Sequence, residues 1–246
     1  MQTCEHDMIS ENLAVFGHYA LPPRREAIRR RADKCRNTRM GRWAISFFRK
    51  RAFRGISDPF DIEIAPHVSA RLWPRSSRCE KRVFAGHQVW DAQERAFLKR
   101  ALANHDSAQG AFVFLDIGAN VGLYSLFLAA KAKELAMDIH ILAVEPDPTN
   151  RGRLEFNAQA SGADIKIAPC AISDEAGMGS MGGGDVNRGE MRLVETDANG
   201  DPVEIMTLLD VCTRNNISSI HAMKLDIEGH DERALRSFFT HAPQAL

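Results

Sequence analysis

The sequence predicts an α/β fold built on a doubly wound parallel sheet, and two observations support this prediction. Apolar runs of strand length alternate with helical patterns through the second half of the chain, which is typical of parallel strands joined by right-handed crossovers. The first of these runs, 112–116, breaks into a glycine turn at 118–122 that opens a helix. This strand-turn-helix geometry brings backbone N–H groups against a ligand.

The elements of the core follow from the spacing of the apolar residues. We expect strands at 112–116, 139–145, 164–170 and 219–226, and helices at 121–135, 148–160, 207–215 and 230–240. With the strands numbered in chain order, the sheet is expected to run 3-2-1-4. A glycine-rich loop and a hairpin ending in VEIMTL are expected to interrupt this alternation after residue 177.

Two further elements are predicted before the core. Short alternating stretches at 60–73, interrupted by prolines, predict a β-hairpin or edge strands. Residues 91–103 have the apolar spacing of a helix, with Asp91 as its N-cap. The predicted domains are a basic N-terminal extension (1–55), a hairpin and helix that pack on the core (56–108), and the core domain (109–246).

The glycine turn indicates what the core binds. It reads D-x-G-x-x-x-G from Asp116 through Gly118 to Gly122, and it lacks the G-x-G-x-x-G spacing of a dinucleotide site. This disfavours a nicotinamide-dependent oxidoreductase and points to S-adenosylmethionine, which has no pyrophosphate. The second apolar run ends in Glu145, and a carboxylate at that strand tip can accept both ribose hydroxyl protons. The alternative is an exposed acid beside Pro146.

Further sequence blocks extend this pattern. They are LDIGANVGLYSL at 115–126, VEPDP at 144–148, Asn157, CAISDEAG at 170–177, Thr207-Leu208 and MKLDIEGHDERAL at 223–235. With these blocks in this order and spacing, residues 60–239 resemble the FkbM family of S-adenosylmethionine-dependent methyltransferases. The resemblance implies a Rossmann-like class I methyltransferase fold with S-adenosylmethionine as cofactor and no obligatory metal.

The expected cofactor-binding residues lie at three strand ends. The glycines let the backbone pass close to the methionine part, and Asn120 either tolerates an unusual backbone angle or binds the carboxylate. Asp116 either holds the cofactor's amino group or fixes the turn by accepting its N–H groups. The adenine of such cofactors lies near Cys170, whereas Asp147 is expected to cap a helix. The full set is Asp116, Gly118, Ala119, Asn120, Gly122, Glu145, Pro146, Cys170 and Ala171.

Three residues after the fourth strand are the catalytic candidates. Methyl transfer from a sulfonium requires that the acceptor be positioned and, for a hydroxyl, deprotonated. Alternation along the strand is expected to point Asp226 and Glu228 in similar directions, an arrangement that suits either general-base work or substrate orientation. Alternatively, one of them binds the cofactor amine or pairs with Lys224. His230 is a competing base, or an exposed residue at a helix start. The expected acceptor is a small molecule or glycan: a sugar, glycan or natural-product hydroxyl.

The end of the chain departs from the resemblance. Leu246 lies 20 residues after Asp226, where a complete sheet of this kind has three more strands. We therefore expect an incomplete sheet whose fourth strand has an open apolar edge, which either self-associates or is shielded by residues 60–84. The alternative function is a truncated, catalytically weak cofactor-binding or interaction protein.

Charge is unevenly distributed although the formal net charge is zero. Residues 24–54, which we call the basic arm, hold 13 Lys or Arg against two acids. Trp43, Phe47 and Phe48 lie among these cations, a combination suited to an anionic membrane surface or, less well, to nucleic acid. The alternative is a solvated leader that contacts the acidic remainder of the chain. Pro22-Pro23 is expected to break an early helix, and we expect the arm to be separable from the fold.

The remaining composition indicates a soluble protein. The sequence has no run of 18 apolar residues and no secretory signal, so a cytoplasmic protein, or one peripheral to the membrane, is expected. Five scattered cysteines indicate neither a disulfide framework nor a zinc site.

Overall fold

The computed structural model describes residues 14–182, 192–194, 201–227, 229 and 231–243. Contacts divide the chain into two compact units, an N-terminal unit of residues 1–96 and a core unit of residues 97–246. The division falls within helix α5 (Ala92–Ala103).

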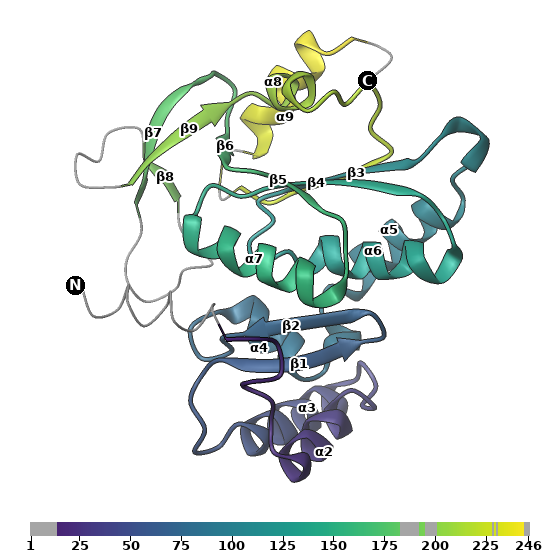
Figure 1. Ribbon diagram of the computed structural model, residues 1–246, viewed down its shortest axis with the longest axis vertical. Helices are drawn as coiled ribbons and strands as arrows, with labels where there is room; N and C mark the ends of the chain where they lie inside the picture. Colours follow the sequence, from purple (N-terminus) through teal and green to yellow (C-terminus); the bar gives the residue numbers. More distant parts are fainter. Residues whose placement is uncertain (1–13, 183–191, 195–200, 228, 230, 244–246) are drawn as a thin grey trace. The chain divides into compact units, whose positions relative to one another are not determined.

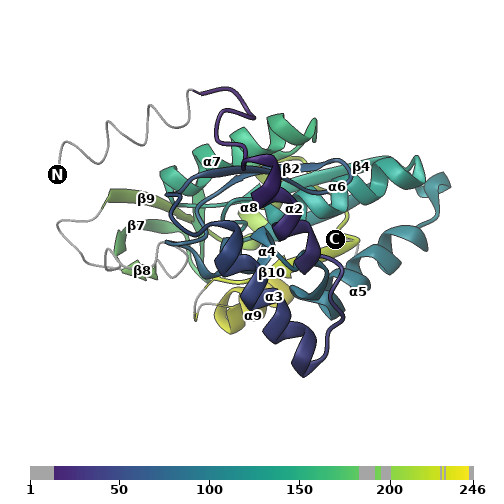
Figure 2. The same cartoon turned by 90° about the horizontal axis from the view of Figure 1, so that it is seen from below.

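The N-terminal unit combines an antiparallel hairpin with helices. Its elements are α2 (Pro23–Ala32), α3 (Arg39–Ala52), β1 (Phe60–Ala65), β2 (Val68–Leu72), α4 (Arg78–Phe84) and the short η1 (His87–Val89). β1 and β2 pair in antiparallel register, which confirms the predicted hairpin. Pro23 does not break α2 but occupies its first turn, where a missing N–H is tolerated. The helices α2 and α3 lie side by side (Figure 2).

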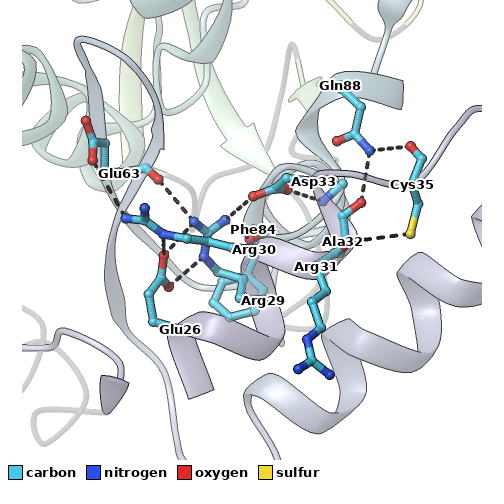
Figure 3. Close-up of polar contacts among 11 residues, drawn as sticks. Glu26, Arg29, Arg30, Arg31, Ala32, Asp33, Cys35, Glu63, Phe84 and Gln88 are labelled. Carbon is cyan, nitrogen blue, oxygen red and sulfur yellow. Dashed lines mark hydrogen bonds and ion pairs between the residues drawn. The ribbon is translucent and has the colours of Figure 1, made fainter. Parts of the chain in front are cut away.

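Arg29 ties α2 into this unit (Figure 3). Its guanidinium lies 2.7 Å from the Glu26 carboxylate and 2.9 Å from that of Asp33. It also donates to the carbonyl oxygens of Phe84 and Glu63, at 3.1 and 3.2 Å. Removing the basic arm would remove these buried contacts, and its separability from the fold stays an untested prediction. The domain boundary predicted at residue 55 falls inside this unit.

The core unit alternates strands and helices in the predicted order. Its elements after α5 are η2 (Ser107–Gln109), β3 (Phe112–Ile117), α6 (Leu123–Leu135), β4 (Ile139–Val144), α7 (Pro148–Ser161), β5 (Lys166–Ala168), β6 (Cys170–Ile172), β7 (Gly177–Gly182), β8 (Arg192–Val194), β9 (Asp201–Met206), α8 (Leu208–Arg214), β10 (Ala222–Leu225) and α9 (Asp231–His241). In the part of the chain that the structure describes, every helix is too short or too polar to cross a bilayer.

The central sheet is parallel and runs in the order β10-β3-β4-β5 (Figure 1). Leu115 on β3 pairs with Leu142 on β4 and with Met223 on β10. This is the predicted 3-2-1-4 order, which is confirmed. β10 is an edge strand of this sheet within the described residues, and self-association through it stays a prediction.

Side chains alternate in direction along β3, so the strand contributes to two hydrophobic cores, one on each face of the sheet. Phe112 and Phe114 pack with Leu98 of α5 and with residues of α6. Leu115 and Ile117 point the other way, into a core shared with α8 and α9. Helices α5, α6 and α7 lie on one face and α8 and α9 on the other, so the sheet is doubly wound in the Rossmann-like manner (Figure 1).

The prediction of a single strand at 164–170 is wrong. The run divides at Pro169 into β5 and β6, because proline has no N–H to continue the ladder. β5 completes the parallel sheet, whereas β6 pairs with β9 in a second sheet of order β6-β9-β7-β8, here called the hairpin sheet. The antiparallel pairing of β7 with β9 confirms the predicted hairpin.

Candidate functional site

The site begins at the turn between β3 and α6. Gly118, Asn120 and Gly122 have φ angles of 71°, 53° and 82°, in the left-handed region that glycine and asparagine adopt most readily. The N–H groups of Gly118 and Ala119 both donate to the Val144 carbonyl, at 2.9 and 3.0 Å. The turn is therefore fixed to the neighbouring strand β4.

Both glycines also leave no room for a side chain. A Cβ at Gly118 would lie 2.1 Å from the carbonyl oxygen of Asp226, and one at Gly122 would lie 2.8 Å from Cγ of Leu154. Close packing against the end of β10 and against α7 therefore requires glycine at both positions.

Asp116, near the end of β3, is fully buried. Its Oδ2 accepts hydrogen bonds from the backbone N–H and the hydroxyl of Ser125, at 3.1 and 2.7 Å. Its Oδ1 has no hydrogen-bond partner among the described residues, although the Lys224 ammonium lies 3.9 Å away. Burial raises the pKa of Asp116, and the Lys224 charge opposes that shift. Asp116 thus fixes the start of α6 with one oxygen and keeps the other available.

Glu145 follows β4 directly and is also buried. Its Oε2 accepts the N–H of Asn120 at 2.7 Å, and its Oε1 accepts the N–H of Asp147 at 3.0 Å. The carboxylate therefore joins the turn after β3 to the turn after β4. The side chain of Asn150 also donates a hydrogen bond to this carboxylate. An ionised carboxylate accepts about four hydrogen bonds in all, so about one position remains for a ligand.

Burial raises the pKa of Glu145 to about 7, although the N–H groups of Asp147 and Asn120 favour its ionised form. Between the ordinary value of 4.5 and about 7, the folded protein holds a proton here that the unfolded chain has released. The contribution of Glu145 to the free energy of unfolding is therefore full at low pH and is lost as the pH rises through about 7.

Pro146 and Asp147 lead from Glu145 into α7. The Arg151 guanidinium donates to the carbonyl of Pro146 and, at 3.3 Å, to that of Glu145. Asp147 accepts the N–H of Asn150 at 2.7 Å, and this confirms its predicted role as the cap of α7.

Cys170 and Ala171 lie in β6, where they pair with Glu204 and Ile205 of β9. Both are buried. They therefore belong to the hairpin sheet, next to the joint at Pro169, and not to the parallel sheet. Burial raises the pKa of the Cys170 thiol to about 11, so it remains protonated at neutral pH.

Lys224 and Asp226 reach the site from β10 and the residues that follow it. The Lys224 ammonium donates to the Gly118 carbonyl at 2.7 Å and lies 3.5 Å from the Asp226 carboxylate. The Asp226 side chain is 68% exposed, and its backbone N–H donates to Ile117 at 3.1 Å. Asp226 therefore presents an accessible carboxylate beside the glycine turn. The other catalytic candidates, Glu228 and His230, lie outside the described residues.

Sequence reasoning missed Ser125, the partner that occupies one oxygen of Asp116. The available signal was a serine in the largely apolar stretch LYSLFLAA, on the helix that Asp116 precedes. It also missed how Asn157 acts: its side-chain amide donates to the Val121 carbonyl at 3.2 Å and so supports the turn from α7.

Comparison of the sequence with known proteins identifies its family. The sequence profile described as Methyltransferase FkbM domain matches residues 116–242, just over half of the chain. A curated relative, the 31-O-demethyl-FK506 methyltransferase FkbM of Streptomyces tacrolimicus, is 27% identical over 154 residues. That match covers 50% of this chain and 58% of the relative, so the chain spans little more than half the length of the protein it matches.

Solved structures of low similarity were also found. The methyltransferase FkbM of Methylobacillus flagellatus KT is 16% identical, with a TM-score of 0.36, over 67% of this chain and 42% of that one. A SAM-dependent methyltransferase of Agrobacterium tumefaciens is 16% identical, with a TM-score of 0.33, over 48% of this chain and 34% of that one.

Proposed function

The chain belongs to the family of FkbM methyltransferase domains, and from that premise we propose that it binds S-adenosylmethionine and methylates a hydroxyl oxygen. The proposed acceptor is a small molecule or glycan, namely a sugar, glycan or natural-product hydroxyl. The buried carboxylate of Glu145 carries the proposal, because it lies at the tip of β4, is hydrogen-bonded to the glycine turn and has about one acceptor position left for a ligand. A ribose hydroxyl supplies such a donor.

The residues present fit the proposed cofactor at a second point. Oδ1 of Asp116 is a buried carboxylate oxygen without a hydrogen-bond donor among the described residues, and an ammonium group would satisfy it. We assign Asp116 to the amino group of the methionine part and Glu145 to the ribose. The backbone of Gly118, Ala119, Asn120 and Gly122 would pass along the methionine part, and that of Pro146, Cys170 and Ala171 would contact the adenosine.

Bound S-adenosylmethionine supplies an activated methyl group on a sulfonium. The chain's own task is therefore to hold the acceptor and to take the proton of its hydroxyl. Asp226 is our candidate for the base that takes this proton. Its carboxylate is exposed at the carboxyl end of the sheet and lies 3.5 Å from the Lys224 ammonium. Glu228 and His230 remain proposed alternatives from the sequence.

Calorimetric titration of the whole chain tests cofactor binding. S-Adenosylmethionine and S-adenosylhomocysteine should bind, whereas a nicotinamide dinucleotide should not. Glu145→Ala should weaken binding by about 1.5–3 kcal/mol, the range for hydrogen bonds to a charged group. Glu155→Ala is the matched control, because Glu155 is exposed on α7 and should leave the affinity unchanged. Unchanged affinity in a folded Glu145→Ala variant would remove Glu145 from the site.

Turnover against a panel of hydroxylated acceptors tests the reaction itself. If Asp226 takes the proton, Asp226→Asn should lower kcat by about 100- to 10,000-fold while the affinity for S-adenosylhomocysteine stays the same. Cofactor binding without turnover on any acceptor would favour a cofactor-binding or interaction protein over an enzyme.

A further inference from the structure

Helix α3 carries an apolar stripe on its outer surface. Met40, Trp43 and Phe47 are spaced three and four residues apart and therefore share one face of the helix. They are 84%, 71% and 43% exposed, and the rings of Trp43 and Phe47 stack with centroids 5.8 Å apart. Exposed aromatic rings gathered in this way mark an interaction surface.

The opposite face of α3 anchors the helix in the N-terminal unit. Ile45 and Ala52 are buried there, and Ile45 packs so closely on Gly86 that a Cβ on Gly86 would lie 2.6 Å from it. The Arg49 guanidinium donates to the Lys81 carbonyl at 3.3 Å. The apolar stripe therefore lies on the face of α3 opposite to the buried one, and the buried contacts hold the helix in place.

The surroundings of the stripe are cationic. Residues 34–57 contain eight Lys or Arg and no acid. Lys50 and Arg51 lie next to the stripe in the last turn of α3, and the Arg51 guanidinium lies 5.7 Å from the centroid of the Phe47 ring. The exposed cations of α3 and its end are Arg39, Arg42, Lys50, Arg51 and Arg54.

We propose that this outer face of α3 docks the protein on an anionic lipid surface, with Trp43 and Phe47 at the headgroup boundary and the flanking cations on lipid phosphates. Aromatic side chains beside Lys and Arg on one helix are the composition of interfacial helices. A second copy of the chain is a poor occupant, because the same face would bring its cations against these cations. A nucleic acid would pair with the cations, but it would offer no apolar environment to the exposed Met40 side chain.

Tryptophan emission of the whole chain provides a direct test. The chain has three tryptophans, and Trp73 and Trp90 are buried, so Trp43 alone is positioned to enter a bilayer. Vesicles with about 30 mol% phosphatidylserine should shift its emission to the blue, and lipids brominated near the headgroup should quench it. Neutral phosphatidylcholine vesicles should do neither. Raising the salt to about 0.5 M should reduce binding, because the attraction is screened.

Point variants separate the two components of the docking surface. Phe47→Ala and the double variant Lys50→Glu/Arg54→Glu should each lower vesicle partitioning at least about fivefold. Matched controls are Phe97→Ala and Arg236→Glu, whose side chains are exposed on other helices and should not change partitioning. Circular dichroism checks that each variant is folded. An unchanged Trp43 emission with anionic vesicles, equal losses in the controls, or tighter binding to a nucleic acid duplex than to vesicles would overturn the proposal.

Discussion

The ammonium of Lys224 donates a hydrogen bond to the carbonyl oxygen of Gly118 at 2.7 Å, across 106 positions of the sequence. This bond ties the edge strand β10 to the glycine turn after β3. The same ammonium is the cation nearest to the buried Asp116, at 3.9 Å, so one side chain both fixes the turn and balances its acid.

Replacing Lys224 should therefore destabilise the core unit. We expect Lys224→Met to lower the free energy of unfolding by about 1.5–3 kcal/mol, because it removes a charged hydrogen bond and leaves Asp116 without its counter-ion. Urea denaturation followed by circular dichroism measures this loss. Lys131→Met is the control: Lys131 pairs with Glu134 on the surface of α6, and the expected cost is at most about 0.5 kcal/mol.

Gly118 is expected to tolerate no side chain. Gly118→Ala places a Cβ in left-handed backbone and also 2.1 Å from the Asp226 carbonyl. Gly162→Ala has a similar φ of 59° but nothing within 4 Å, so it should show the backbone cost alone, about 1–2 kcal/mol. We expect Gly118→Ala to cost about 1–3 kcal/mol more. Equal losses in thermal or urea unfolding would contradict the close contact with β10.

Affinity for the proposed nucleoside should depend on pH. Because Glu145 has a pKa of about 7 and accepts a ribose hydrogen bond best in its ionised form, binding should weaken as the pH falls below about 7. The limit is about tenfold per pH unit for one proton. 5′-Methylthioadenosine is the suitable probe, because it lacks the titrating amino-acid part. A flat profile between pH 6 and pH 8 would show that the Glu145 carboxyl does not titrate on binding (these two values bracket the shifted pKa by roughly one unit).

Arg29 should dominate the stability of the N-terminal unit. Arg29→Met removes a buried cationic donor from two carboxylates and two carbonyl groups, and we expect a loss of about 3–5 kcal/mol. Arg30→Met is the control, since Arg30 is 59% exposed and should cost at most about 1 kcal/mol. Fluorescence of the buried Trp73 and Trp90 reports unfolding of this unit, and comparable losses in the two variants would contradict the prediction.

Periodicity and strand-end chemistry predicted the parallel sheet well. Phe112, Phe114, Leu115 and Ile117 form an apolar run typical of a strand buried on both faces, and the structure gives it a core on each side. The cap at Asp147 followed from Pro148 after it. These features depend on residues close together in the sequence.

The features that sequence missed depend on contacts between distant residues. Pro169 divides an apolar run between two sheets, and only the pairing of β6 with β9 reveals where the second half goes. The burial of Arg29 likewise arises from Glu63 and Phe84, more than thirty positions away, so its cationic segment resembled a solvated arm.

Pro169 also connects the hairpin sheet closely to the tip of β4. The Ala168 carbonyl, one residue before it, accepts the Glu145 N–H at 3.1 Å, and β6 begins one residue after it. Only Pro169 therefore separates the hairpin sheet from the residue whose carbonyl holds the Glu145 backbone at the tip of β4. We therefore expect a displacement of the hairpin sheet to displace the backbone of Glu145 as well.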